Sequence, residues 1–281
     1  MRIKGKTHHM RLPWILLNII SLSTFQSIQT KKNYDVPKTG DFSSKKIIAT
    51  NIIHLKPLPY PLDSWQYFLQ HLPTEDKPIL DFNGKAISNQ AKHFAILTYD
   101  VGHSDLQQCA DALIRIRSEY LFSQKKYSQI GFHFNSGYFY SWYDYLRGVR
   151  PQLKGSNLVL IHLATASEIS HVSLRKYLDL VYAYANTISL CRELKSTDSL
   201  ETGTIIIYPG NPGHCCMIVD EAIGDKSDTV FKIVEGYMPA QSIYILSNPY
   251  EPEWSPWYHL KKGEISTASC IFRSYYLKKF E

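Results

Sequence analysis

Apolar residues recur at helical spacing over residues 103–121 and give the predicted helix one face for a core: Leu106, Ala110, Leu113 and Tyr120. Ser104 and Gln107 have the spacing of a capping box, which predicts that the helix begins at this serine. Cys109 then lies at the end of the first turn, where free backbone N–H groups and the helix dipole favour an anion. A cysteine in an amphipathic helix is also commonly a small core residue, so the helix alone leaves both interpretations open.

The rest of the chain alternates between short β-prone runs and two further helical stretches. Helical spacing predicts a short helix at 64–72 and a long amphipathic helix at 173–194. Apolar runs rich in β-branched residues predict strands at 94–99, 157–163, 204–208, 214–219, 229–235, 242–246 and near 269–277. A helix followed by hairpin-connected strands predicts one α+β domain over residues 47–281, with an antiparallel sheet.

The N-terminal residues have the layout of a secretory signal peptide. Basic residues precede an apolar run at 12–22, and small or polar residues follow to Thr30. We therefore expect a signal peptide over residues 1–29, with an uncleaved N-terminal anchor as the alternative, and a polar linker over 30–46. The protein is then exported, either periplasmic or anchored in the membrane and facing the periplasm.

Composition and charge limit the classes of partner that we expect for this protein. The net charge of +6 suits anionic polymers such as cell-wall material, and a solvated surface explains it equally well. The sequence contains no nucleic-acid module, phosphate loop or zinc-type cysteine spacing, so we expect no nucleic acid, no cofactor and no metal, and membrane contact only through the N-terminal segment. Five cysteines are an odd number, which in an oxidising compartment leaves one free, paired between chains, or reactive.

A base for the cysteine is predicted at His214, which follows a Pro-Gly turn and opens a strand. If Asp220 pairs with Thr229 across the next loop, His214 lies directly opposite Glu235, close enough for a carboxylate to orient the imidazole. A slip of one residue would turn Glu235 to the other face. Cys109 is thus predicted as nucleophile, with the alternative that the histidine is a turn residue and the glutamate is merely solvated.

Neighbouring residues add two hypotheses about the same site. Gln107 and Gln108 precede the cysteine, and an amide from either, with the N–H of Cys109, would stabilise an oxyanion. Cys215 and Cys216 point to opposite faces of their strand, so either could compete as the reactive thiol. Neither has a helix N-terminus, which favours Cys109.

Eight aromatic residues crowd residues 131–150, in the run GFHFNSGYFYSWYDYLRGVR. They form either a core patch or a rim of flat rings for a sugar or peptide. The candidate substrate contacts within this stretch are Asn135, Trp142, Tyr143 and Arg147.

Residues 90–281 resemble an uncharacterised exported bacterial family, the domain of unknown function numbered 4846. Four stretches carry the resemblance: DLQQCADALIRIRSEYLFSQKKY, KYLDLVYAYANTISL, PGHCCMIVD and GYMPAQ. The pattern in turn resembles NlpC-type and CHAP-type amidases of the papain-like superfamily, with a cysteine at a helix start, a histidine opening a strand and a polar residue on the next strand. Carried over, these are Cys109, His214 and Glu235. The 105-residue interval from cysteine to histidine implies a helical, aromatic insertion.

The resemblance implies a papain-like fold with the nucleophile helix packed against the sheet. It also implies an exported thiol hydrolase, an amidase or peptidase, that acts on cell-envelope peptides. The alternative is a non-catalytic protein on the same fold that binds glycan or peptide, or supports the envelope.

Overall fold

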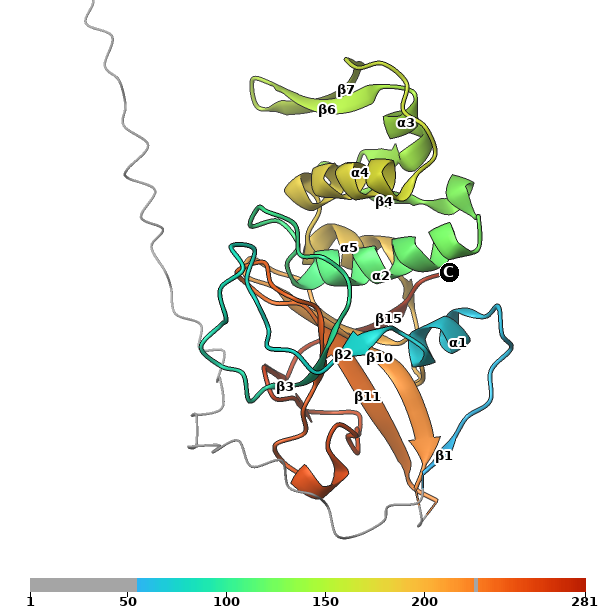
Figure 1. Cartoon of the computed structure of the whole chain (residues 1–281), viewed down its shortest axis with the longest axis vertical. Coiled ribbons are helices and arrows are strands. Elements are labelled where there is room, and N and C mark those ends of the chain that lie inside the picture. The colour runs from blue at the N-terminus through green and yellow to red at the C-terminus, as the bar shows by residue number, and fades with distance from the viewer. Residues whose placement is uncertain (1–54, 225–226) are drawn as a thin grey trace, which may run out of the picture. The chain divides into compact units, whose positions relative to one another are not determined.

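A computed structural model describes residues 55–224 and 227–281 as a mixed α+β arrangement (Figure 1). The predicted leader at 1–29 and linker at 30–46 lie outside the described residues. Within the described part, the main sheet has nine strands, and every pairing in it is antiparallel. This confirms the predicted α+β class with an antiparallel sheet.

The sheet brings distant parts of the chain side by side. From edge to edge its strands are β2 (Thr74–Glu75), β3 (His93–Leu97), β12 (Tyr244–Leu246), β11 (Thr229–Glu235), β10 (His214–Ile223), β9 (Ile205–Tyr208), β15 (Tyr276–Lys279) and β8 (Lys195–Ser196). β1 (Lys56–Pro57) pairs with the far end of β10. Smaller hairpins are β4 (Gly131–His133) with β5 (Phe139–Ser141), β6 (Val149–Lys154) with β7 (Asn157–His162), and β13 (Ile265–Ser266) with β14 (Ile271–Phe272).

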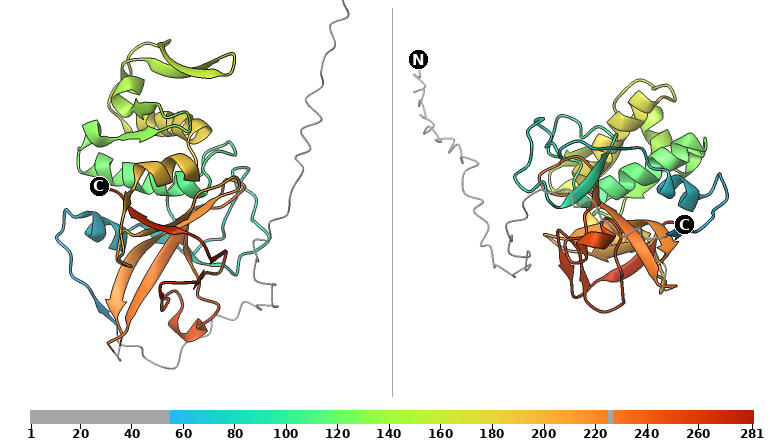
Figure 2. Two further views of the ribbon diagram at one scale, coloured as in Figure 1. Left: turned by 180° about the vertical axis from the view of Figure 1, so that it is seen from behind. Right: turned by 60° about the horizontal axis from the view of Figure 1, so that its bottom comes forward.

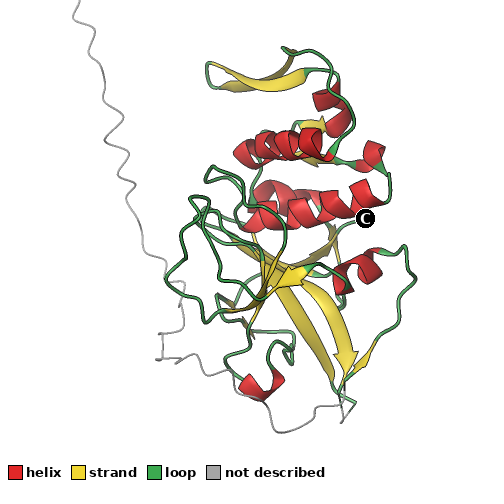
Figure 3. Cartoon of the chain, viewed as in Figure 1, coloured by secondary structure: helices red, strands yellow, loops and turns green. Residues whose placement is uncertain are grey.

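The longer helices lie together on one side of the main sheet (Figures 2 and 3). The helices are α1 (Trp65–Gln70), α2 (Cys109–Ser123), α3 (Trp142–Leu146), α4 (His171–Tyr184) and α5 (Thr187–Glu193), with 3-10 turns at Tyr127–Gln129 and Pro252–Trp254. Among the described residues, none of the helices combines the length and apolarity that a membrane crossing requires.

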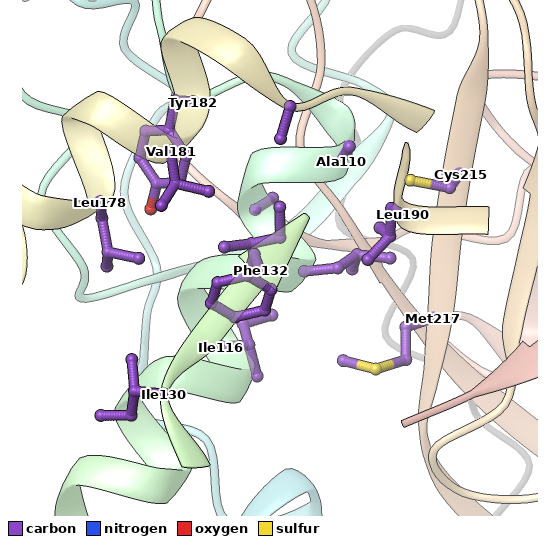
Figure 4. Close-up of a cluster of buried hydrophobic side chains, with 14 of the residues drawn as sticks. Ala110, Ile116, Ile130, Phe132, Leu178, Val181, Tyr182, Leu190, Cys215 and Met217 are labelled. Carbon is purple, nitrogen blue, oxygen red and sulfur yellow. The ribbon is translucent and has the colours of Figure 1, made fainter. Parts of the chain in front are cut away.

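Alternation along β10 sends successive side chains to two cores. Cys215 and Met217 project toward the helices (Figure 4) and belong to the core built around α2, α4 and α5. Cys216 points the other way, into a second core with Ile233 and Phe272. The sheet is therefore buried on both faces around the start of β10.

The helix predicted over 103–121 begins later than its sequence pattern indicates. α2 starts at Cys109, where the first intrahelical bond runs from Ala112 N–H to the Gln108 carbonyl at 2.9 Å. The residues from Ser104 to Gln107 stay outside the helix because Asp105 accepts a hydrogen bond from the backbone N–H of Ala240 at 2.6 Å. The predicted capping box at Ser104 is wrong, and Cys109 occupies the first helical position.

The long helix predicted over 173–194 is two helices, with α4 ending at Tyr184 and α5 beginning at Thr187. Asn186 interrupts it because its side-chain oxygen accepts from the backbone N–H of Ile188 at 2.8 Å, capping a new helix. The amphipathic pattern continues across this break, which is why spacing alone did not reveal it.

Candidate active site

Cys109 lies at the N-terminus of α2, where backbone N–H groups have no partner within the helix. Asp111 Oδ2 accepts from the backbone N–H of Gln108 at 3.0 Å, which closes the start of the helix. The residue is 7% exposed, and its Sγ lies 3.8 Å from the carbonyl oxygen of Gly213. The sulfur therefore faces the turn that leads into His214.

His214 is the first residue of β10, and its ring is held from several sides. Nε2 donates to Glu235 Oε2 at 3.0 Å. The ring stacks on Phe272, with centroids 5.7 Å apart, and meets Tyr237 edge-on at 5.2 Å. Since Nε2 is taken by Glu235, Nδ1 is the nitrogen left to interact with the sulfur of Cys109, and ring and sulfur shift each other's pKa.

The predicted register between β10 and β11 is wrong, although the contact it predicted forms. β10 runs on to Ile223, which pairs with Thr229, and a bulge at Val219 shifts the ladder so that Asp220 pairs with Lys232. Continued from the Met217–Val234 pair, the ladder places Glu235 opposite Cys216, diagonal to His214. Diagonal neighbours about 7–8 Å apart remain within reach of long side chains.

Glu235 is fully buried at the end of β11, and both of its oxygens have partners. Oε2 accepts from His214, and Oε1 accepts from the hydroxyl of Tyr244 on the neighbouring strand β12. Burial by itself would raise the pKa of Glu235, but the hydrogen bond and charge of His214 lower it. The carboxylate is therefore ionised and fixes the orientation of the ring.

The charges of the cluster favour a thiolate and an imidazolium. The pKa of Cys109 is held well below its usual range, first by a hydrogen bond from the Cys215 thiol and then by His214, against the opposing effect of burial. Burial alone would lower the pKa of His214, but its hydrogen bonds to Cys109 and Glu235 raise it to about 10. Such a pair carries a nucleophile and a proton donor at neutral pH.

Cys215 and Cys216 occupy opposite faces, as alternation predicts, and neither is poised as a nucleophile. Burial raises the pKa of both thiols well above the usual range. Cys215 instead interacts with the sulfur of Cys109 and helps to lower its pKa, a role the sequence analysis missed. The signal was present, because Cys215 faces the helices from the strand that His214 opens.

The two glutamines differ. Gln107 is fully buried; its Nε2 donates to the Asp100 carbonyl at 3.4 Å and its Oε1 accepts from Arg115 at 3.4 Å, so this amide is engaged away from the sulfur. Gln108 is the N-cap of α2, and its Nε2 donates to Asp105 at 3.1 Å. The backbone N–H of Ala110 helps to lower the pKa of Cys109.

The aromatic stretch divides between core and surface. Five of its eight rings are buried, Phe132, Phe134, Tyr140, Trp142 and Tyr145, and three are exposed, Tyr138, Phe139 and Tyr143. Trp142 is 0% exposed and packs edge-on against Tyr127, so its predicted substrate contact is wrong. Asn135, Tyr143 and Arg147 reach the surface, where Arg147 pairs with Asp144.

Gly236 sets how closely the end of β11 approaches the start of α2. A β-carbon at this position would lie 2.7 Å from Cβ of Ala112 and 2.9 Å from the carbonyl oxygen of Gln108, closer than such atoms pack. We expect Gly236→Ala to push α2 from the sheet, to lower the free energy of unfolding by about 1–3 kcal/mol and to slow alkylation of Cys109. Urea denaturation and iodoacetamide labelling check this; an unchanged midpoint with an unchanged rate would contradict it.

These elements define an α+β domain with a buried cysteine–histidine–glutamate cluster where a helix N-terminus meets a sheet. The chain belongs to the family described as a domain of unknown function (4846), whose model matches residues 56–279. This confirms the predicted family. No curated protein and no solved structure matches the chain.

Proposed function

We propose that this chain is a thiol hydrolase, an amidase or peptidase, that acts on cell-envelope peptides. The observation that carries the proposal is that three separate elements bring Cys109, His214 and Glu235 into one cluster, in which His214 bonds Glu235 at 3.0 Å and lowers the pKa of Cys109. A thiol, a base within hydrogen-bond reach and a third group that orients the base are what nucleophilic cysteine catalysis requires.

The reaction follows from the charges of the cluster. The thiolate of Cys109 attacks an amide carbonyl, so that an S–C bond forms and the carbonyl oxygen becomes an oxyanion. Imidazolium His214 then gives its proton to the departing nitrogen as the C–N bond breaks, leaving a thioester. Neutral His214 next takes a proton from water, whose oxygen attacks the thioester and releases the acid and the thiolate. Glu235 keeps the ring in place throughout.

The oxyanion is assigned to the N-terminus of α2. Backbone N–H groups there point outward from the helix and act together with its dipole. Gln107 cannot contribute its side chain without breaking its bonds to Asp100 and Arg115. The side chain of Gln108 is half-buried, and its amide donates to Asp105 near the surface. Gln108 is therefore the better candidate of the two glutamines for binding the oxyanion.

Two further parts of the proposal rest on the sequence. The order of helix-borne cysteine, strand-opening histidine and carboxylate on the next strand resembles NlpC-type and CHAP-type amidases, which supports a papain-like fold. The predicted leader at residues 1–29 supports an exported protein whose substrates are peptides of the cell wall.

Digestion of purified peptidoglycan tests the proposal. The wild-type protein should release soluble peptides and create new amino or carboxyl termini, and Cys109→Ala should abolish this release. Cys191→Ala is the matched control, because this thiol lies on α5 outside the cluster and burial raises its pKa. Release by Cys109→Ala equal to the wild type would contradict the mechanism.

A second candidate, binding of glycan or peptide without cleavage, draws on the exposed rings of Tyr138, Phe139 and Tyr143. It would be favoured if the wild type sediments with peptidoglycan without cutting it and Tyr143→Ala weakens the sedimentation.

A further inference from the structure

A pocket of about 240 Å³ with both polar and apolar walls opens next to the cysteine–histidine cluster. Three segments enclose it: residues 87–92 ahead of β3, residues 237–241 after β11, and residues 268–269 in the β13–β14 turn. Tyr237 connects the pocket to the cysteine–histidine cluster. It lines the pocket, and the centroid of its ring lies 5.2 Å from that of His214. A molecule that occupies this pocket therefore lies beside the proposed catalytic base.

Lys92 places a buried positive charge in the wall of this pocket. The residue is 8% exposed, and its Nζ lies over the rings of Tyr237 and Tyr244, at 4.3 and 4.9 Å from their centroids. Within residues 55–224 and 227–281 it forms no ion pair with a carboxylate; Glu235, whose charge it feels, is bonded to His214 and Tyr244. A buried ammonium without a bonded anion is costly, and aromatic faces offset part of that cost.

Gln241 adds an amide donor with no partner. The residue is 1% exposed, and its Nε2 is buried without a hydrogen-bond acceptor among the described residues. Buried polar groups are nearly always paired, so an unpaired donor on a residue that lines a pocket points to a ligand that completes it. Burial lowers the pKa of Lys92 while the charge of Glu235 raises it, and an anion in the pocket would act in the same direction as Glu235.

The other residues that line the pocket indicate which kind of anion fits it. Ile87, Met238, Pro239 and Ala268 are apolar, and Ser88, Asn89 and Ser269 add neutral polar side chains, so Lys92 is the single cation among the residues that line the pocket. One ammonium and one amide N–H match the two oxygens of a carboxylate. A doubly charged phosphate normally calls for more donors and for arginine.

We propose that this pocket binds a carboxylate of the substrate, at a peptide terminus or an acidic side chain, close to the bond that Cys109 attacks. The inference rests on the proposed function and narrows it: the substrates are peptides that carry a free carboxylate near the scissile amide, with Lys92 and Gln241 as specificity-determining residues.

A matched pair of alkylating peptides tests the pocket. N-iodoacetyl-glycylglycine ends in a carboxylate, and its C-terminal amide is the neutral twin; in both, the sulfur of Cys109 displaces iodide as an S–C bond forms. The measured quantity is the ratio of the two second-order rate constants at Cys109, acid over amide, followed by peptide mass spectrometry. We expect Lys92→Met to lower this ratio about tenfold, the size of a lost charge-assisted hydrogen bond.

Two variants sharpen the result. Lys85→Met removes an exposed lysine from the turn before the pocket and should leave the ratio unchanged. Gln241→Leu should lower the ratio several-fold without lowering the urea midpoint, because it removes a donor that has no partner. It also keeps the test open if Lys92→Met folds poorly.

The outcomes separate this inference from the proposed function. A ratio that does not change in Lys92→Met or in Gln241→Leu overturns the carboxylate pocket, however fast the thiol reacts. Slow, His214-independent alkylation by the neutral peptide overturns the hydrolase instead, while the ratio still reports on the pocket.

Discussion

Alkylation of Cys109 by iodoacetamide should be nearly independent of pH from about 5.5 to 8, whereas in His214→Ala it should rise with pH across this range. The cause is the charge state of the pair. The pKa of His214 is raised to about 10, so the ring is an imidazolium across this range, and the lowered pKa of Cys109 keeps the sulfur a thiolate. Without the ring, burial is opposed mainly by Cys215, so the pKa of Cys109 rises toward the ordinary value of about 8.5 and the labelling rate increases with pH.

The expected ratio of the alkylation rates of wild type and His214→Ala at pH 6 follows from two opposing effects. An ordinary thiol is then about 0.3% ionised, but a thiolate of low pKa is intrinsically less nucleophilic, so the wild type should react about tenfold faster than His214→Ala. The gap should widen on further acidification until Cys109 itself takes up a proton. Peptide mass spectrometry reads each cysteine separately.

Controls for this prediction are built into the chain. Cys270 has a pKa raised by burial to about 12, so its slower labelling should rise with pH in every variant. Glu235→Gln keeps the shape of the carboxylate but removes its charge, and should shorten the plateau at its alkaline end. A wild-type rate that climbs tenfold per unit between about pH 5.5 and 8 would show that the sulfur is an ordinary thiol.

The contact between His214 and Glu235 could be predicted from sequence even though the register behind it was wrong. The error displaced Glu235 by two residues along its strand, and because side chains alternate with a period of two, it stayed on the face of His214. A displacement of one would have lost the site. The face of a strand is thus predicted more safely than the pairing of its residues.

The features of the site that could not be predicted from the sequence depend on residues that meet only in the folded chain. Nothing near Gln107 in sequence indicates that Arg115 and the Asp100 carbonyl engage its amide. The pocket beside Tyr237 combines Lys92 with Gln241, which are nearly 150 residues apart. The sequence shows that residues 131–150 are rich in aromatic residues, but it does not show which of the rings are buried. That depends on how β4, β5 and α3 pack against α4.

Replacement of Arg115 by methionine should produce the largest loss of stability among single polar substitutions in α2, about 3–5 kcal/mol. Arg115 is 1% exposed; its Nε donates to Glu119 at 2.6 Å and its guanidinium pairs with Asp100 at 2.9 Å. Asp100 lies in the loop that leads from β3 to Cys109, so the arginine joins this loop to the helix. Methionine keeps most of the apolar stem and leaves Glu119 buried, with His171 as its remaining ion-pair partner in the described part of the chain.

The stability lost in Arg115→Met should be larger at neutral pH than in acid. Burial would raise the pKa of Asp100, but Arg115 and Arg175 lower it, so the folded-state pKa is below the unfolded value of about 3.9. The stabilisation is therefore present above that value and is lost as pH falls through the folded-state pKa. The difference between wild type and Arg115→Met in urea denaturation should be full at neutral pH and shrink in acid.

Arg147→Met is the matched control, because its partly exposed pair with Asp144 should contribute no more than about 1 kcal/mol. The double variant Arg115→Met/Glu119→Leu then identifies the cause of the loss. If the cost comes from an uncompensated buried carboxylate, removing Glu119 as well should restore part of the stability. Equal or greater destabilisation in the double variant would show instead that the loss comes mainly from the packing of Arg115 and its ion pair with Asp100.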